Sequence, residues 1–309
     1  MSARILKILG TSSQTPTRDR NHSGYYLRWD NIGLLIDPGE GTQRQMIFFN
    51  VSPSSITHIF ISHFHGDHCL GLPGVLQRLS LAKVGHPIHL IYPESGAEFL
   101  EKLCTCSSYY DNNELVLHPI TDEKELKVSD IAALKFIALD HVIDCIGFRL
   151  QESDGVTLIP ELLDKYKVSP YQRGELCQRG VVQTKIGTVK LTDVSVMKRG
   201  QSFAYVSDTR YFEQLMEQIL GVDLLLSETT FRDQDSALAY EYKHLTAMQV
   251  GLLAKNAGIK KLVISHFSQR YKEIGELIDE TAEHFPEAIG AIDGMTVNIP
   301  KRERKLTKC

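Results

Sequence analysis

The sequence predicts an α/β protein in which helices cover the outer faces of its sheets. Short apolar runs rich in β-branched residues alternate with amphipathic runs of helical length along most of the 309 residues. Elements that alternate in this way pack as layers around a core. A chain of this length can bury a substantial core. We expect a single domain over residues 1–309 with one insertion.

The expected elements form two sets. In the first set we expect strands at 4–9, 25–29, 33–36, 57–62 and 87–92, and helices at 42–49, 72–82 and 95–103. In the second set we expect strands at 133–139, 146–150, 203–207, 223–227 and 261–265, and helices at 211–220, 246–257 and 272–284. The apolar period alone does not distinguish two facing sheets from one doubly wound sheet.

Composition favours a cytoplasmic protein without a membrane partner. No apolar stretch approaches the ~18 to 20 residues that a membrane helix needs, and the first residues lack the pattern of a signal peptide. The six cysteines are scattered without a Cys-x-x-Cys pair, which indicates reduced thiols.

The most informative motif is the segment His63-Phe64-His65-Gly66-Asp67-His68, which follows the apolar run 57–62. It places four metal-ligating side chains within six residues at the end of a predicted buried strand. Imidazole nitrogens and carboxylate oxygens suit divalent zinc, which can keep an open position for water. The alternative is a polar surface loop, although three of the 12 histidines fall here. We interpret the segment as part of a dinuclear hydrolytic site.

A short internal repeat points to a second contribution to that site. The tetrapeptide Ile-Ser-His-Phe occurs at residues 61–64 and again at 264–267, each time after an apolar run. Both copies end a predicted strand in a histidine, so two strand ends could bring His63 and His266 together from opposite halves of the chain.

Charge is unevenly distributed along the chain. The net charge is −4, but residues 164–200 carry eight basic and three acidic side chains, and the tail 301–308 carries five basic and one acidic. The rest of the chain is therefore at −13. A basic appendage on an acidic body favours a nucleic-acid partner. The alternative is a solvated loop and a solubilising tail.

Several motifs together resemble the tRNase Z family, the tRNA 3′-processing endoribonucleases of the metallo-β-lactamase superfamily. Besides the histidine loop, the resemblance rests on Asp37-Pro38-Gly39-Glu40-Gly41-Thr42, Ser207-Asp208-Thr209-Arg210, Glu228-Thr229-Thr230-Phe231, His244-Leu245-Thr246 and Ser265-His266-Phe267-Ser268-Gln269-Arg270-Tyr271. It implies a metallo-β-lactamase αβ/βα sandwich of two facing mixed sheets with helices outside. It also implies that the Pro- and Gly-interrupted segment 152–200 is an inserted tRNA-binding arm.

The resemblance further implies two Zn²⁺ ions per chain. One ion is expected at His63, His65 and His141, and the other at Asp67, His68 and His266, with Asp208 bridging them. Taken alone, His141 would more often be structural, and Asp208 could be the N-cap of the helix expected at 211–220.

Catalytic and substrate-binding roles follow from the same resemblance. His244 is expected to donate a proton to the leaving 3′ oxygen and Glu228 to orient it, while Asp67 assists deprotonation of the attacking water. Arg270 and Thr246 are expected to contact phosphate, because a guanidinium can pair with phosphoryl oxygens. For Arg270 the alternative is a surface salt bridge.

The expected activity is a zinc-dependent endoribonuclease that removes the 3′ trailer of precursor tRNA and leaves a 3′ hydroxyl for CCA addition. Members of this family often form homodimers, so we expect a homodimer. One alternative is another hydrolase of the same fold that acts on a small phosphodiester or thioester. The other is a catalytically silent RNA-binding protein.

Overall fold

The computed structural model describes residues 4–121 and 125–300. Within them the chain divides into two compact units, one formed by residues 4–151 and 202–300 and the other by Glu152–Gln201. The basic tail from Lys301 lies outside the described residues. In the described part of the chain, none of the helices has both the length and the apolar character needed to cross a bilayer.

The first unit contains a seven-stranded sheet with the order β18-β1-β2-β3-β4-β5-β6. Its strands are β1 (Ile5–Gly10), β2 (Gly24–Trp29), β3 (Ile32–Ile36), β4 (His58–Phe60), β5 (Ile88–Pro93), β6 (Leu115–Ile120) and β18 (Thr296–Asn298). Pairing is antiparallel from β18 to β3 and parallel from β3 to β6. The sheet is therefore mixed.

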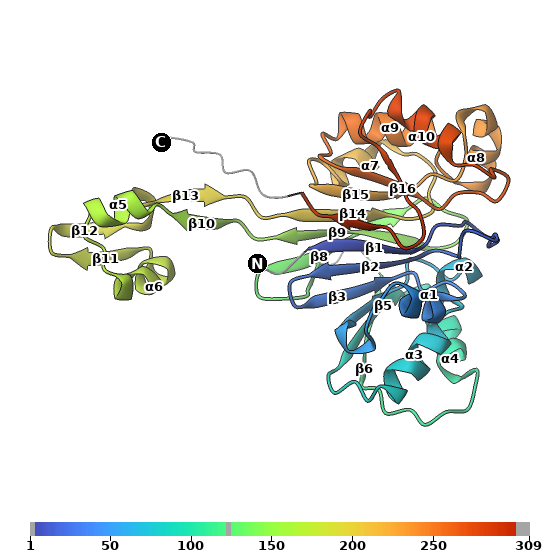
Figure 1. Cartoon of the computed structure of the whole chain (residues 1–309), viewed down its shortest axis with the longest axis horizontal. Helices are drawn as coiled ribbons and strands as arrows, with labels where there is room; N and C mark the ends of the chain where they lie inside the picture. The colour runs from blue at the N-terminus through green and yellow to red at the C-terminus, as the bar shows by residue number, and fades with distance from the viewer. Residues whose placement is uncertain (1–3, 122–124, 301–309) are drawn as a thin grey trace. The chain divides into compact units, whose positions relative to one another are not determined.

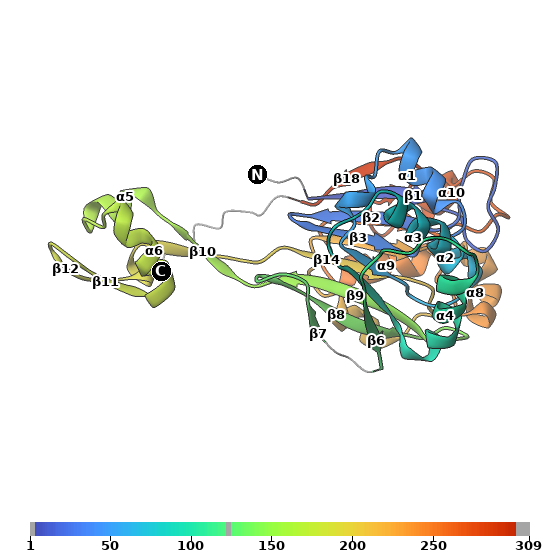
Figure 2. The same cartoon turned by 90° about the horizontal axis from the view of Figure 1, so that it is seen from below.

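A second seven-stranded sheet of the same unit has the order β17-β16-β15-β14-β9-β8-β7. Its strands are β7 (Glu125–Lys127), β8 (Ala132–Leu139), β9 (Cys145–Glu152), β14 (Ser202–Val206), β15 (Leu224–Glu228), β16 (Leu262–Ser265) and β17 (Ile289–Gly290). Pairing is parallel from β14 to β17, whereas β14 and β9 are antiparallel, as are β7 and β8. Figure 2 shows β6 and β7, which form outer edges of their sheets.

The two sheets face each other and helices cover their outer sides (Figure 1). Buried residues of both sheets form the central core, among them Leu27, Phe60, Phe148, Phe203 and Leu226. Helices α1 (Thr42–Phe48), α3 (Leu72–Leu81) and α4 (Ala97–Thr105) pack on the first sheet, and α7 (Glu213–Gln218), α9 (Ala247–Asn256) and α10 (Gly275–Ala282) pack on the second. The predicted αβ/βα sandwich is confirmed.

Some short elements escaped the sequence prediction, namely β6, β7, β17, β18 and helix α8 (Ser236–Tyr242). Strand β6 is a half-exposed edge strand that contains Pro119, so its apolar pattern is weak. The helix expected at 211–220 begins only at Glu213, with Phe212 as its N-cap. Asp208 therefore does not cap this helix.

The second unit has a small core of its own. It contains α5 (Pro160–Lys165), α6 (Pro170–Arg179), the hairpin of β11 (Val181–Thr184) with β12 (Gly187–Lys190), and the pair of β10 (Gly155–Leu158) with β13 (Ser195–Lys198). The core residues are Leu163, Val168, Leu176, Val182, Val189 and Val194. Helix α6 starts with a capping box of Ser169 and Gln172 and ends at Gly180, whose φ of +74° suits glycine.

The insertion begins and ends at neighbouring positions of one sheet. Gln151 at the end of β9 pairs with Ser202 at the start of β14 in an antiparallel register. The second sheet is consequently continuous across the point where the second unit is inserted.

Three histidines lie side by side on β4, β5 and β6. The rings of His58 and His89 stack with their centroids 4.8 Å apart, and His89 Nδ1 lies 2.9 Å from His118 Nε2. Burial, together with the charges of His89 and His118, lowers the pKa of His58 to about 3. His58 is the first residue of β4, so this cluster lies at the end of the strand opposite the histidine loop.

We predict that His58 makes stability depend on pH. Folding lowers the pKa of His58. Its contribution to the free energy of unfolding is therefore fully present above the unfolded pKa of about 6.5 and is lost as the pH falls below that value. Between pH 7 and pH 5 the parent should lose about 2 kcal/mol more unfolding free energy than His58→Gln. Urea titrations at both pH values measure this difference. His86→Gln, a change of a loop histidine, should keep the parental dependence, and equal losses in the parent and His58→Gln would contradict the prediction.

Candidate metal centre

The predicted ligand residues all follow strands that end at one edge of the facing sheets. Four of them follow β4, partly on the short helix α2 (Gly66–Cys69), while the other three follow β8, β14 and β16. Strand ends at one edge bring residues together that are far apart in the sequence. The seven residues are His63, His65, Asp67, His68, His141, Asp208 and His266.

Four of these side chains form a first donor group. His65 Nδ1 lies 3.0 Å from His63 Nε2 and 3.2 Å from His141 Nε2. Asp208 Oδ2 lies 3.7 Å from His63 Nε2 and 3.9 Å from His141 Nε2. Ligand atoms of a tetrahedral zinc, each about 2.1 Å from the metal, are about 3.4 Å apart. The spacing of this group therefore fits a zinc ion.

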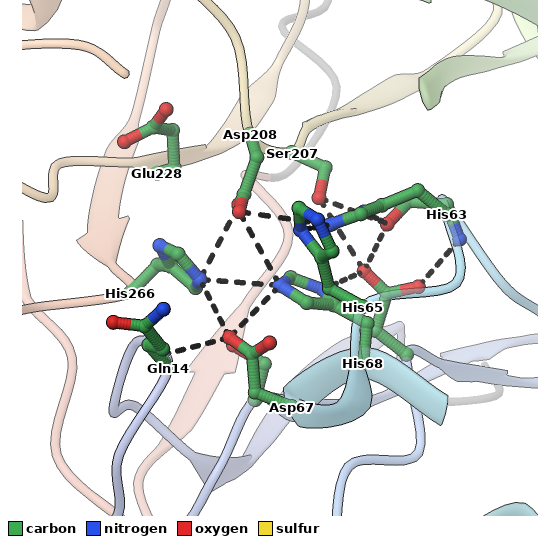
Figure 3. Close-up of polar contacts among 12 residues, drawn as sticks. Gln14, His63, His65, Asp67, His68, Ser207, Asp208, Glu228 and His266 are labelled. Carbon is green, nitrogen blue, oxygen red and sulfur yellow. Dashed lines mark hydrogen bonds and ion pairs between the residues drawn. The ribbon is translucent and has the colours of Figure 1, made fainter. Parts of the chain in front are cut away.

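A second donor group adjoins the first. His68 Nε2 lies 3.1 Å from His266 Nε2 and 3.3 Å from Asp67 Oδ2, and His266 Nε2 lies 3.4 Å from Asp67 Oδ2. Asp208 Oδ1 is 3.3 Å from His266 Nε2, and Asp208 Oδ2 is 3.5 Å from His68 Nε2. Figure 3 shows Asp208 contacting histidines of both groups. Asp208 thus lies within reach of donors of both groups.

Buried hydrogen bonds turn the histidine nitrogens toward this cluster. His68 Nδ1 donates to Asp37 Oδ2 at 2.8 Å, and His141 Nδ1 donates to the Lys243 carbonyl at 3.2 Å. Because both partners only accept, each ring carries a proton on Nδ1, and its Nε2 faces the cluster. Neighbours of this kind fix the tautomer of metal-binding histidines. Ring nitrogens about 3 Å apart have the spacing of donors that share one metal ion.

Asp208 is also suited to bind a cation. It is buried, and its Oδ1 has no hydrogen-bond partner among the described residues. Burial opposes the charge, but His266, His68 and His244 hold the pKa of Asp208 well below its usual range. An ionised, buried carboxylate oxygen without a hydrogen bond is costly unless it pairs with a charge or binds metal. The residues present therefore fit divalent metal.

Sequence reasoning gave no role to Asp37, which follows β3. Its carboxylate accepts hydrogen bonds from the backbone N–H of Ser62 (2.7 Å), the Ser62 hydroxyl (2.6 Å), the Tyr205 hydroxyl (2.6 Å) and His68 Nδ1. Ser62 Oγ also lies 2.9 Å from His63 Nδ1. Since the Ser62 proton goes to Asp37, His63 must donate to Ser62. The available signal was an aspartate directly after a buried strand.

His244 lies beside the cluster and pairs with Glu228. His244 Nδ1 is 3.0 Å from Glu228 Oε1, which also accepts the backbone N–H groups of Thr209 and Leu245. Burial alone would lower the pKa of His244, but Glu228 and Asp208 raise it to about 9. His244 Nδ1 is 4.0 Å from Asp208 Oδ2. The ring is therefore close enough to act on a group bound at the cluster.

The two predicted phosphate contacts differ in their surroundings. The Arg270 side chain is 43% exposed, lies 3.3 Å from Asp235, and stacks over Phe231. Thr246 is fully buried and is the N-cap of α9, where its hydroxyl accepts the Gln249 N–H at 3.2 Å. Arg270 can reach a ligand from the surface, whereas the contacts of Thr246 are those of a helix cap. Both roles in substrate binding stay predictions.

Comparison with known proteins places the fold. A family model described as Metallo-beta-lactamase superfamily matches residues 17–129. The solved structure of the short form of human tRNase Z superimposes with a TM-score of 0.70 at 24% identity, over 96% of this chain and 100% of that one. The fold and the donor cluster define a protein of the metallo-β-lactamase class.

Relatives that match over nearly the whole chain identify the family within this class. Ribonuclease Z of Nocardia farcinica is 45% identical over 304 residues, which cover 98% of this chain and 100% of the relative. Ribonuclease Z of Salinispora arenicola is 42% identical over 304 residues, with 98% of each chain covered. The chain belongs to the ribonuclease Z family, as its motifs led us to expect.

Proposed function

We propose that the chain removes the 3′ trailer of precursor tRNA by metal-dependent hydrolysis and leaves a 3′ hydroxyl for CCA addition. The observation that carries this proposal is the pair of adjoining donor groups with the His244–Glu228 pair beside them, in a member of the ribonuclease Z family. The complete donor set argues against a catalytically silent protein. The basic inserted unit argues against a substrate as small as a simple phosphodiester.

Two Zn²⁺ ions are the proposed cofactors. His63, His65 and His141 would hold one ion and Asp67, His68 and His266 the other, with Asp208 reaching both. When bound, such ions supply a nucleophile at neutral pH and positive charge at the phosphoryl oxygens.

The chain itself supplies the proton transfers. Glu228 holds Nδ1 of His244, which leaves Nε2 to donate a proton to the leaving 3′ oxygen. A raised pKa keeps this ring protonated near neutral pH, as a general acid requires. Asp67, whose carboxylate accepts the Gln14 N–H at 2.8 Å, is proposed to assist deprotonation of the water.

The proposal also includes residues that contact the substrate. Arg270 and Thr246 are the proposed phosphate contacts, and Thr246 is also the N-cap of α9. We also propose that the protein forms a homodimer and acts in the cytoplasm, where it would encounter precursor tRNA.

Mapping the cut on a precursor tRNA with a 3′ trailer tests the function. The parent should cut on the 3′ side of the acceptor stem and leave a 3′ hydroxyl. His65→Ala removes a donor from the first group and should lower the metal content measured by mass spectrometry and abolish cleavage. His86→Ala, a change of a loop histidine, is the control and should retain both properties. Full activity of metal-depleted protein would rule the proposal out.

We predict that His244→Ala retains metal but loses turnover. Loss of a general acid lowers the rate by ~10² to 10⁴, and this loss should appear with precursor tRNA. A small phosphodiester with a good leaving group should be affected less, because its leaving oxygen needs less protonation. Rates on both substrates and metal content are measured together. If metal and activity fell in parallel, His244 would be a ligand.

The unit Glu152–Gln201 is proposed as the tRNA-binding arm. Residues 164–200 have a net charge of +5. Of their eight basic side chains, Arg179 forms an ion pair with Glu175. Tyr171, at the start of α6, is 95% exposed, which suits stacking on a base. The proposed metal ligands and His244 all lie outside this unit.

We predict that replacing residues 152–200 with a short Gly/Ser linker weakens binding of precursor tRNA and spares the hydrolysis of a small phosphodiester. The paired positions of Gln151 and Ser202 allow a short connection. For each phosphate that the variant no longer neutralises, the salt dependence should flatten by roughly 0.7 to 0.9 log units of affinity per log unit of salt. Binding titrations at several salt concentrations measure both effects. If the tRNA affinity and its salt dependence were unchanged, another part of the chain would bind the tRNA. A variant in which the basic residues of the tail from Lys301 are neutralised is the comparison.

A further inference from the structure

Thr230 lies between the His244–Glu228 pair and the second donor group. Its hydroxyl is 2.6 Å from Glu228 Oε2, 2.9 Å from His266 Nδ1, and 3.3 Å from His244 Nδ1. Thr230 and Glu228 are both buried. One hydroxyl group therefore contacts the proposed proton-transfer pair and a proposed metal ligand at once.

The direction of these hydrogen bonds follows from the single proton of the hydroxyl. The hydroxyl has two acceptors within reach, Glu228 Oε2 at 2.6 Å and the His266 carbonyl oxygen at 3.1 Å. The carboxylate is nearer, and a hydrogen bond to a charged acceptor is the stronger, so the Thr230 hydroxyl donates to Oε2. The Thr230 oxygen can then only accept from His266, whose Nδ1 must carry its proton. With Nδ1 engaged in this way, Nε2 of His266 faces Asp67 and His68.

The other half of the site contains the same arrangement. There the buried carboxylate of Asp37 accepts hydrogen bonds from His68 and from the Ser62 hydroxyl. The Ser62 oxygen in turn accepts a hydrogen bond from His63. Glu228 likewise binds His244 directly and reaches His266 through a hydroxyl.

We propose that Thr230 is a positioning residue that couples Glu228 to His266, so that one carboxylate orients both the proton donor and a metal ligand. Without the hydroxyl, Glu228 Oε2 keeps the backbone N–H of Thr230 as a partner, at 3.1 Å, and His266 Nδ1 loses its acceptor. The His266 ring is then free to turn or change tautomer. This inference rests on the proposed function.

Thr230→Val tests the coupling because it removes the hydroxyl and keeps the shape of the side chain. Loss of such an outer partner lowers metal affinity or activity by about 10- to 100-fold. We expect zinc affinity, measured by competition with a chromogenic chelator, to fall by this factor. Turnover of precursor tRNA at saturating zinc should fall by a similar factor, while hydrolysis of bis(4-nitrophenyl) phosphate, which has a good leaving group, should fall less.

Two further variants separate hydrogen bonding from packing. Thr230→Ser keeps the hydroxyl and should restore both zinc affinity and turnover, whereas a packing role would make serine the more damaging change. Thr229→Val is the matched control, because Thr229 is buried and its hydroxyl has no hydrogen-bond partner among the residues described. It should behave like the parent.

Parental zinc affinity or parental tRNA turnover in Thr230→Val would overturn the coupling. The two proposals fail separately. If the parent did not cut precursor tRNA, the function would be wrong, and the zinc affinities of Thr230→Val and Thr230→Ser would still decide whether Thr230 orients His266.

Discussion

The hydrogen bonds accepted by the buried Asp37 carboxylate hold this site together. Asp37 follows a strand of the first sheet, and Tyr205, which donates to it, lies on the second. The same carboxylate fixes His68 and, through Ser62, His63. Burying a carboxylate costs several kcal/mol unless its oxygens are satisfied. The orientation of two histidines therefore depends on one carboxylate, which also accepts a hydrogen bond from the second sheet.

Backbone strain accompanies this arrangement. Asp37 and His266 have φ angles of +45° and +61°, in the left-handed region that non-glycine residues rarely adopt. Each such residue costs of order 1–3 kcal/mol and persists only where surrounding contacts enforce it. Here the enforcing contacts are the hydrogen bonds of Asp37 and the link from Thr230 to His266. Both strained positions directly follow strands at the edge that carries the cluster.

The sequence predicted those site residues that lie together in one short motif. The segment from His63 to His68 was recognisable because four donors lie in six residues at a strand end. His141 and Asp208 were assigned by resemblance, since neither has a distinctive local pattern. The roles of Asp37 and Thr230 could not be predicted, because they depend on hydrogen bonds that join residues of the two sheets or of neighbouring loops. Thr246 carries a local signal as well, because its capping box with Gln249 marks the start of α9.

The paired ends of the insertion have a consequence for its replacement. Residues 152–201 connect to the sheet by two chain segments, since Gln151 and Ser202 are antiparallel neighbours and β10 pairs with β13 a few residues further on. The paired ends make the inserted unit exchangeable, because a different module whose ends are one strand spacing apart could be grafted at the same two residues without shifting the register of β9 and β14. Variation in this unit can therefore accumulate independently of the metal centre.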